Sequence, residues 1–453
     1  MRNMFKNQTR AGLISFLVLA NLLIVSCSKT DLKQSPSTYE ASQANSGKAE
    51  RADGDVATDW YRLHFSILLE RNSAFNGVYY AYFGVALWEA VRPGVRNSQS
   101  FYGKIRMMPM MPEPEKNQGY NYVVSANAAL ADLTRKMFSG LTDANKKAID
   151  DLEAKYNQQE SPDQNSAVFV RSQAYGKAIA QATFDWYKTD DLILSSAGYI
   201  VPTGPAAWIP TPPLFLPQIP INAFFGKATT MVASIAPIRA KTFPFTYSEN
   251  PADDFYKMER QVYDLSKVLT PEQKETAFYW LDQGNGTAYT PPGHDFFVLT
   301  QCLEQANVTL DVAAETYAKA GIAERDGSIV IFGSKYITNL IRPVSYIRRV
   351  IDPAWSPLFS TPPHPEYPAA HAGGTGSVML TATTVLGDEV GVIDRSQVML
   401  NHPARVYKNL EAVAQEAGIS RNYAGIHYLI SITEGLDCAH RVATEIGKIK
   451  VRD

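Results

Sequence analysis

The chain has 453 residues, of which 45% are hydrophobic and 19% are charged, which is the balance of an ordinary globular protein. This length allows one large domain or two to three smaller ones, each able to bury a core without disulfides. The formal net charge of −2 excludes a general nucleic-acid or anion-binding surface, so any cationic site must be local.

The N-terminus has the layout of an export signal. The chain starts with three basic residues, Arg2, Lys6 and Arg10. A mostly apolar run over residues 11–25 follows and leads into Ile24-Val25-Ser26-Cys27, which resembles a bacterial lipobox. We therefore predict a signal peptide over residues 1–26 and a lipid on Cys27, which would anchor an exported protein in the bacterial cell envelope at the outer membrane. An uncleaved membrane anchor is the alternative, but the run is short for a spanning helix.

The rest of the chain divides into a tether and one domain. Residues 27–55 are rich in polar side chains and offer almost nothing to bury, so we predict a flexible tether there. We predict a single helical domain over residues 56–453, because no later stretch reaches the ~18 apolar residues of a membrane span. Cys302 and Cys438 are the remaining cysteines, and the sequence leaves open whether they pair.

Helical spacing of apolar residues dominates the domain, and alternating strands are scarce. Thr142 is a predicted N-cap, and Thr270 with Pro271 and Gln273 forms a capping box. We predict helices over residues 74–91, from 142, 167–188, from 270, 295–321, 326–350, 372–386, 407–417 and 421–447. Seven prolines between residues 202 and 220 exclude a long helix there and, with the nearby aromatic residues, predict an extended arm packed on an all-α bundle. A disordered loop is the alternative for the arm.

Three separated motifs in the C-terminal third carry cations and histidines. The first is Lys335-Tyr-Ile-Thr-Asn-Leu-Ile-Arg342-Pro343, whose two cations would share one helix face, roughly 10 Å apart along the axis. The second is Pro368-Ala369-Ala370-His371, which precedes a run of small residues and a helix start whose free amides suit an anion. The third is Ser420-Arg421-Asn-Tyr-Ala-Gly-Ile-His427, predicted as the first turns of a helix with Ser420 as the cap.

Each motif taken singly has a plainer interpretation. Two cations on one helix stripe usually form a solvated basic face, and a histidine on a helix is usually a satisfied core residue. His294 follows Pro-Pro-Gly but has no cation pair before it at the right distance, so we interpret it as structural. The other histidines, His64, His402 and His440, show no spacing typical of a metal cluster.

Together, the order and spacing of the motifs resemble the type 2 phosphatidic-acid-phosphatase (PAP2) superfamily. Its pattern is Lys, six residues, Arg-Pro; then Pro-Ser-Gly-His; then Ser-Arg, five residues, His. The flanks at Arg342–Arg348 and Thr361–Pro368 resemble the soluble branch of vanadium-dependent haloperoxidases. The similarity extends back through Leu269–Gln273 and Thr290–His294, so the resemblance implies that helical fold for most of the mature chain.

The resemblance implies a pocket for vanadate or phosphate within residues 326–447. Three cations, Lys335, Arg342 and Arg421, would hold the oxygens of the anion, together with the backbone N–H of Ala370. His427 would ligate vanadium in a haloperoxidase, or attack phosphorus in a phosphatase. His371 would be the acid–base group. Two secondary candidates are His364, which stands where this branch often has a residue near the halide, and Asp326, which could orient one of the cations.

The sequence departs from the pattern at three positions. The serine of the second motif is Ala369 and its glycine is Ala370, so a hydroxyl donor is missing. Four residues after the last histidine, where the pattern usually has Asp, stands Ser431, and Glu434 is a candidate substitute. The leading hypothesis is a vanadate-dependent haloperoxidase that uses peroxide to oxidise halide. The alternatives are a phosphate-ester hydrolase acting through a phosphohistidine, and a non-catalytic surface lipoprotein that retains the fold. The halide, the organic substrate and the oligomeric state are not encoded in any recognisable feature.

Overall fold

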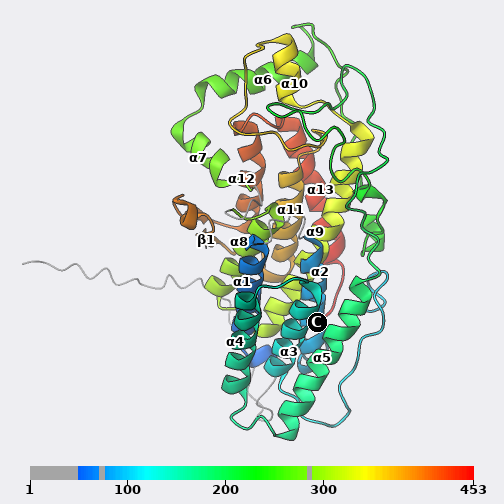
Figure 1. Cartoon of the computed structure of the whole chain (residues 1–453), viewed down its shortest axis with the longest axis vertical. Coiled ribbons are helices and arrows are strands. Elements are labelled where there is room, and N and C mark those ends of the chain that lie inside the picture. Colours follow the sequence, from blue (N-terminus) through cyan, green and yellow to red (C-terminus); the bar gives the residue numbers. More distant parts are fainter. Residues whose placement is uncertain (1–48, 71–76, 283–287, 453) are drawn as a thin grey trace, which may run out of the picture. The chain divides into compact units, whose positions relative to one another are not determined.

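A computed structural model describes residues 49–70, 77–282 and 288–452 (Figure 1). The predicted signal peptide, Cys27 and most of the predicted tether lie outside the described residues. The described part is all-α apart from one small antiparallel pair of strands, as the sequence predicts. The elements are α1 (Asp55–Glu70), α2 (Gly77–Val91), α3 (Tyr122–Met137), α4 (Asp143–Glu160), α5 (Ala167–Tyr187), α6 (Asp254–Val268), α7 (Pro271–Tyr279), α8 (Pro291–Ala306), α9 (Leu310–Thr338), α10 (Pro343–Val350), α11 (Ala370–Leu386), β1 (Val392–Asp394), β2 (Arg405–Tyr407), α12 (Leu410–Tyr423) and α13 (Leu429–Gly447).

The folded part begins earlier than residue 56. A short 3-10 helix covers Ala49–Arg51, and Ala49 is fully buried. The segment then runs beside the α8–α9 connection, where Gly54 N–H donates to Val308 O at 2.9 Å and Leu310 N–H donates to Ala52 O at 2.9 Å. Residues 49–55 have the polar composition typical of a tether, but backbone hydrogen bonds hold them in place, and such bonds do not depend on apolar side chains.

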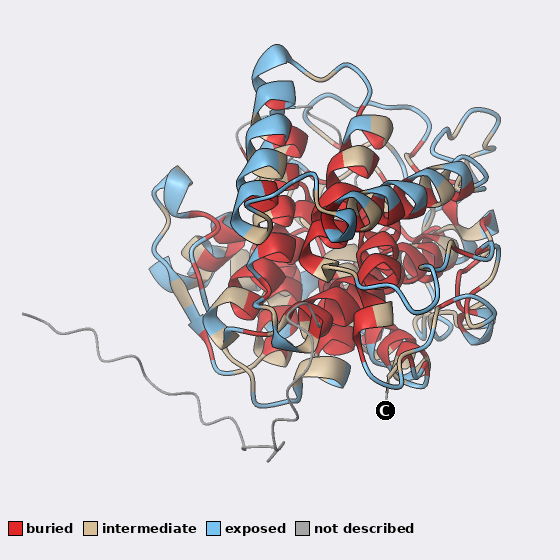
Figure 2. Ribbon diagram, turned by 90° about the horizontal axis from the view of Figure 1, so that it is seen from below, coloured by how far each residue is buried: buried red, intermediate tan, exposed pale blue. Residues whose placement is uncertain are grey.

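Helix α9 packs chiefly against α2 and α11. Figure 2 shows that buried residues fill the interior of the helical bundle. The crossing of α2 and α9 depends on two glycines. A Cβ at Gly84 would lie 2.4 Å from Tyr317 O, and a Cβ at Gly321 would lie 2.4 Å from Tyr80 O. The two backbones therefore touch directly, which no residue with a side chain permits at either position.

The predicted helix starts at Thr142 and Thr270 are confirmed. Thr142 Oγ1 accepts a hydrogen bond from Asn145 N–H at 3.1 Å. Thr270 forms both halves of a capping box with Gln273, and Pro271 occupies the first turn of α7. Each cap satisfies backbone donors that the first turn of a helix leaves without a partner.

The predicted boundaries around the first motif are wrong. Helix α8 ends at Asn307, a left-handed residue with φ 50°, and α9 then continues unbroken through residues 321–326 as far as Thr338. The chain leaves the helix at Asn339, with φ 49°, and Arg342 is extended with ψ 150° because it precedes Pro343. Lys335 and Arg342 therefore do not share a helix face, and Arg342 stands in the link before α10.

The predicted helix over residues 421–447 is also wrong at its start. Arg421 lies in the last turn of α12, and His427 lies in the link between α12 and α13. Gly425, with φ 78°, reverses the chain there, a conformation that favours glycine. Ser420 does not cap a helix, since its Oγ donates to Ala417 O at 2.7 Å.

The proline-rich segment is an extended arm, as predicted. Within the described residues, no α-helix lies between Tyr187 and Asp254. The arm packs on the link before α10, where Trp208 N–H donates to Asn339 O at 2.9 Å and Ile341 N–H donates to Ala206 O at 2.7 Å. The Trp208 side chain is fully buried, so the arm holds the segment that carries Arg342. No helix in the described part of the chain is long and apolar enough to span a bilayer.

Candidate functional site

The three motifs meet at one place in the fold. The C-terminal end of α9, the segment before α11 and the link between α12 and α13 all contribute residues to it. Helices α11 and α13 approach closely there, because a Cβ at Gly435 would lie 2.6 Å from Ala369 O. Ala369 N–H donates to Ser431 O at 2.9 Å, which fixes the start of α11 against α13.

Lys335 is fully buried and points at the segment before α11. Its Nζ donates to the carbonyl oxygens of Pro365 and Glu366, both at 2.9 Å. An ammonium group has three donors, so one N–H remains for another acceptor. Burial, reinforced by the neighbouring charge of Arg342, lowers the pKa of Lys335 well below its usual range. The hydrogen bonds of the Lys335 ammonium group go to neutral carbonyl oxygens, so they do not neutralise its charge.

Arg342 is fully buried, and each of its five N–H groups has an acceptor. Three are backbone carbonyls: His364 O at 2.8 Å, Ile426 O at 2.9 Å and Pro362 O at 3.2 Å. The other two are histidine nitrogens, His427 Nε2 at 3.1 Å and His364 Nδ1 at 3.0 Å. The guanidinium thus joins the first motif to the other two. Burial lowers the pKa of Arg342 to about 10.

His427 Nδ1 contacts Glu366 Oε1 at 2.7 Å. Glu366 is fully buried, and its carboxylate also accepts from Tyr428 N–H at 3.0 Å and from Ser431 Oγ–H at 2.6 Å. Burial raises the pKa of Glu366 to about 7 against the opposing effect of these donors and cations. Glu366 could not be recognised from the sequence, because a glutamate between prolines carries no spacing that relates it to a histidine 61 residues away.

Glu434 does not replace the missing carboxylate at position 431. Its Oε1 accepts from Lys241 N–H at 2.8 Å and from Arg441 at 3.2 Å, on another side of α13. Asp326 also has a different role from the one expected. It accepts from the backbone N–H groups of Met231 and Val232, both at 2.8 Å, and it pairs with Arg325 at 3.3 Å rather than with a cation of the motifs.

His371 and Arg421 lie on a second side of the site. His371 stands in the first turn of α11, with its Nε2 3.3 Å from Asp282 Oδ2. Arg421 donates to Trp280 O at 2.5 Å, and its guanidinium lies 5.2 Å from the centre of the Phe359 ring. Among the described residues, Arg421 Nε has no hydrogen-bond partner, and the contact of His371 Nε2 with Asp282 is long at 3.3 Å. Burial and the charge of Arg421 lower the pKa of His371 to about 4, so His371 is neutral at pH 7.

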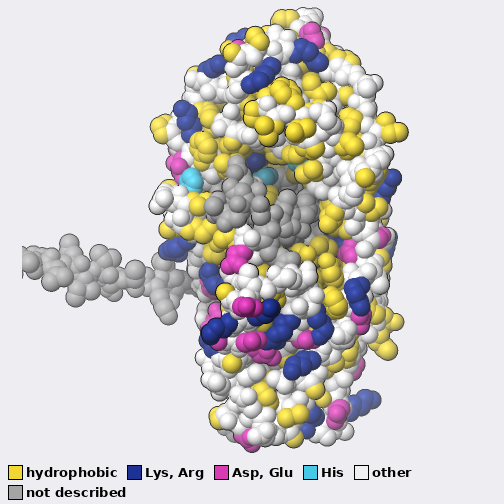
Figure 3. Space-filling view, in the orientation of Figure 1, with side chains coloured by type: hydrophobic (Ala, Val, Ile, Leu, Met, Phe, Trp, Pro, Cys, Tyr) yellow, Lys and Arg dark blue, Asp and Glu magenta, His cyan; other side chains and the backbone are white. Residues whose placement is uncertain are grey.

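The two sides of the site act on each other electrostatically. Burial lowers the pKa of His427 well below its usual range, and the charges of Arg342, Lys335 and Arg421 lower it further. Arg421 is itself destabilised by burial, which lowers its pKa to about 10. The three buried cations and the two histidines therefore form one cationic site. Its members are Lys335, Arg342, Arg421, His371 and His427. Figure 3 shows a recess above the middle of one face, in which histidine and basic atoms are visible.

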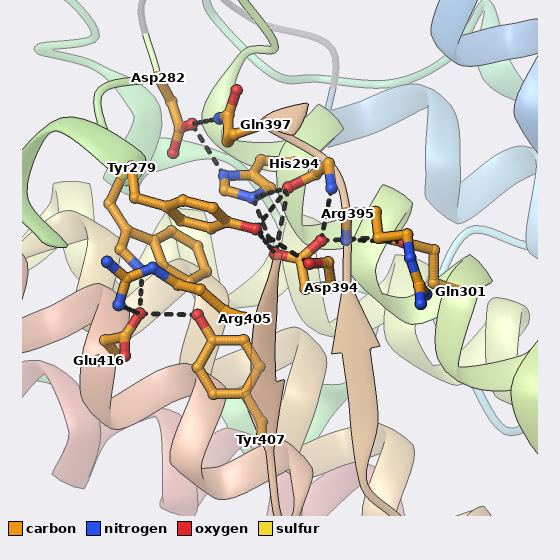
Figure 4. A network of polar contacts seen from close by, with 12 residues as sticks. Tyr279, Asp282, His294, Gln301, Asp394, Arg395, Gln397, Arg405, Tyr407 and Glu416 are labelled. Atoms are coloured by element: carbon orange, nitrogen blue, oxygen red, sulfur yellow. Dashed lines mark hydrogen bonds and ion pairs between the residues drawn. The ribbon is translucent and has the colours of Figure 1, made fainter. Parts of the chain in front are cut away.

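Asp282 connects the site to a buried ionic network that surrounds His294 (Figure 4). His294 Nδ1 contacts Asp282 Oδ1 at 2.9 Å, and its Nε2 contacts Ser396 Oγ at 2.6 Å and lies 3.6 Å from Asp394 Oδ2. Burial opposes a charge on His294, but the two aspartates raise its pKa to about 10. His294 is thus a charged internal histidine, and it shares Asp282 with His371.

His364 and Ala370, two further candidates, lie close to the site. His364 is buried against Arg342, as described above, and its ring centre lies 5.3 Å from that of Phe332. Ala370 is the first residue of α11, so its backbone N–H belongs to the first turn, where the helix itself supplies no acceptor. Ala369 is fully buried and contributes no hydroxyl group.

The fold corresponds to a known class. Residues 315–450 match the family model described as the VCPO second helical-bundle domain, a span that contains all three motifs. The chain therefore has the fold of vanadium haloperoxidases, which are related to the PAP2 superfamily. No curated protein sequence matches the chain.

Three solved structures of bacterial vanadium-dependent haloperoxidases are similar to the chain. The chain is similar to a bacterial vanadium-dependent iodoperoxidase, with 26% identity and a TM-score of 0.77 over 91% of this chain and 99% of the other. It also resembles a holo-type bacterial vanadium-dependent chloroperoxidase, with 13% identity and a TM-score of 0.58 over 84% of this chain and 95% of the other. The apo-type chloroperoxidase gives 15% identity and a TM-score of 0.56 over 90% and 95% of the two chains.

Proposed function

We propose that this protein is a vanadate-dependent haloperoxidase-like oxidoreductase that uses hydrogen peroxide to oxidise halide. The observation that supports it best is the contact between Arg342 and His427 beside buried Lys335, on a haloperoxidase fold. A neutral histidine held among buried cations could supply a nitrogen ligand to an oxyanion such as vanadate, while the cations would balance its negative charge.

The residues present fit a tetrahedral or bipyramidal oxyanion. Burial lowers the pKa of each of the three cations, and the charge of Arg342 lowers the pKa values of Lys335 and Arg421 further. A bound anion would relieve that repulsion, as charge-assisted hydrogen bonds do at oxyanion sites. The donors free to hold it are the third N–H of Lys335, Nε of Arg421 and the first-turn amide of Ala370. Vanadate, when bound, would supply a Lewis acid that activates peroxide.

The protein's own groups have separate tasks in this proposal. The carbonyl contacts of Arg342 hold the guanidinium in place, so anion oxygens would replace its two histidine contacts and free His427 Nε2. His371 is neutral near pH 7 and would accept the proton of the incoming peroxide. Asp282 beside it would stabilise the charged imidazole that results.

Two alternatives use the same scaffold. A phosphatase would employ the same anion pocket, because vanadate resembles the transition state of phosphoryl transfer. A non-catalytic lipoprotein is favoured by Ala369 and Ala370, since loss of one oxyanion donor commonly costs about 10²–10³ in rate. The contact between His427 and buried Glu366 weighs against the non-catalytic alternative, because Glu366 supplies a carboxylate partner for His427 that a serine at position 431 cannot provide.

Parallel assays on one purified sample test the proposal. Iodide and bromide oxidation with peroxide is measured with and without orthovanadate, beside hydrolysis of an aryl phosphate. The proposal expects halide oxidation that depends on vanadate and disappears in His427→Ala, while Glu434→Gln, a matched carboxylate change on α13, retains it. Phosphate-ester hydrolysis without halide oxidation would support the phosphatase instead. Inactivity in both assays, with no vanadate binding, would support the non-catalytic alternative.

A further inference from the structure

Hydrogen-bond direction determines which nitrogen of His427 carries the proton. Arg342 can only donate, so His427 Nε2, which lies 3.1 Å from its guanidinium, must be the acceptor. The ring proton therefore lies on Nδ1, and it is donated to Glu366 Oε1 at 2.7 Å. This tautomer leaves the lone pair of Nε2 directed at the Arg342 guanidinium, so Nε2 is the nitrogen that could bind a metal centre.

The Glu366 carboxylate is itself held in place. One oxygen accepts from His427 Nδ1–H and from Tyr428 N–H, and the other accepts from Ser431 Oγ–H. The main chain of the same residue is fixed by Lys335 Nζ. Glu366 is fully buried, so water does not compete for these bonds. A carboxylate whose two oxygens are both held by hydrogen bonds can orient a histidine ring.

We propose that Glu366 is the positioning residue for His427, in place of the aspartate that the related motif carries four residues after the histidine. The carboxylate has moved from α13 to the segment before α11, and Ser431 on α13 now supplies the hydroxyl that orients it. The substitution at position 431 therefore preserves the support of His427. This inference rests on the proposed function only for the identity of the anion; the tautomer does not depend on it.

The test compares Glu366→Leu, Glu366→Gln and the double variant Glu366→Leu/Ser431→Asp with the wild type. Nitrogen-15 NMR of selectively labelled histidine gives the tautomer, with the His427 signal assigned by its loss in His427→Gln. Calorimetry gives the affinity for inorganic phosphate and for orthovanadate. Glu434→Gln is the matched control, because that carboxylate lies on α13 without touching His427.

We expect the wild type to show the proton on Nδ1. Glu366→Leu loses this preference and binds both anions at least about tenfold more weakly, as removal of an outer-shell partner does at other sites. The double variant recovers the tautomer and most of the affinity, because Ser431 Oγ lies 2.6 Å from the carboxylate oxygen that leucine removes. Glu434→Gln equals the wild type in both measurements.

Glu366→Gln keeps the shape of the side chain and serves if the leucine variant does not fold. Its neutral amide weakens a charge-assisted bond, so the Nδ1 proton resonance of His427 moves upfield. An unchanged resonance in this variant, or an unchanged tautomer and affinity in Glu366→Leu, overturns the proposal. If the wild type binds neither anion but the tautomer changes as expected, the positioning role stands and the proposed function falls.

Discussion

The guanidinium of Arg342 donates a hydrogen bond to Nε2 of His427 at 3.1 Å, which joins a cation from the link before α10 to a histidine from the link before α13. The contact exists because both residues lie outside helices, where the chain can turn toward the common centre. Each of the two links contains a left-handed residue close to the end of its preceding helix, Asn339 after α9 and Gly425 after α12.

Arg342→Lys separates the charge from the geometry of this contact. A lysine retains the charge but has three donors on one atom, so it cannot serve three carbonyls and two histidines at once. We expect the affinity for phosphate or vanadate to fall by about tenfold or more. We also expect the free energy of unfolding to drop by about 2–4 kcal/mol, since carbonyls are left without partners. Calorimetry and urea denaturation measure the two effects, and an unchanged affinity would exclude Arg342 from the anion site.

His371→Gln tests the acid–base role. Because the pKa of His371 is lowered to about 4, the neutral form dominates from pH 5 upward. The pH profile of halide oxidation should therefore lose activity on the acid side near pH 4. The glutamine variant should oxidise halide about 10²–10⁴-fold more slowly while it still binds vanadate. A wild-type rate that falls only below pH 3 would contradict the assignment.

His294 links stability to pH. Its pKa is raised to about 10, so the stabilisation it contributes is complete below its ordinary value near 6.5 and declines as the pH rises through 10. The pKa of Asp394 is lowered to about 2, mainly by His294 against the effect of burial, so its contribution is lost as the pH falls from 4 through 2. His294→Gln should cost about 3–5 kcal/mol, because it leaves buried aspartates unpaired. The difference in unfolding free energy from wild type should be largest between pH 4 and 6.5 and smaller at pH 9; equal differences at all pH values would show that His294 is neutral.

Gly84→Ala tests the contact between α2 and α9. The new Cβ would lie 2.4 Å from Tyr317 O, a backbone atom that cannot move away without shifting the helix. We expect a loss of about 1–3 kcal/mol or more, typical of overpacking. Gly119→Ala is the control, since its Cβ would have no neighbour closer than 3.8 Å at an exposed position. Thermal unfolding of both variants measures the difference, and equal melting temperatures would mean that the helices can separate freely.

Cys27→Ser tests the predicted export and lipid anchor. If Cys27 is acylated, the wild type incorporates labelled palmitate and fractionates with membranes, whereas the variant does neither. The domain from residue 49 onward should fold equally in both, because Cys27 lies outside it. A wild type that takes up no lipid, or a variant that still fractionates with membranes, would contradict the prediction.

The helical class, the caps at Thr142 and Thr270 and the extended arm could be predicted, because each depends on local preferences that neighbours in the sequence determine. The helix limits around the motifs could not. The seven-residue spacing of Lys335 and Arg342 is compatible with one helix face. Pro343, however, makes the backbone of Arg342 extended, and this local effect decides the structure over the helical spacing.

The order of the three motifs in the chain predicted that they meet at one site. It did not predict which residues their side chains contact there. Glu366, Asp282 and the carbonyl oxygens of residues 362–366 are brought to the site by tertiary packing, and no spacing relates them to the histidines. The prediction that Glu434 replaces the missing carboxylate at position 431 was wrong. Glu434 is only three residues further along α13, but its side chain faces Lys241 and Arg441 rather than His427.

Lys335 and Arg342 together fasten five main-chain oxygens, those of Pro362, His364, Pro365, Glu366 and Ile426. Either residue would be retained by selection for a folded chain alone, whether or not any reaction takes place. Side chains that make no hydrogen bond are not under this constraint. Ala369 and Ala370 carry only methyl groups, and the Ala369 main chain still holds α11 against α13 through its bond to Ser431 O, so an engineer can vary these two side chains while that backbone contact stays in place.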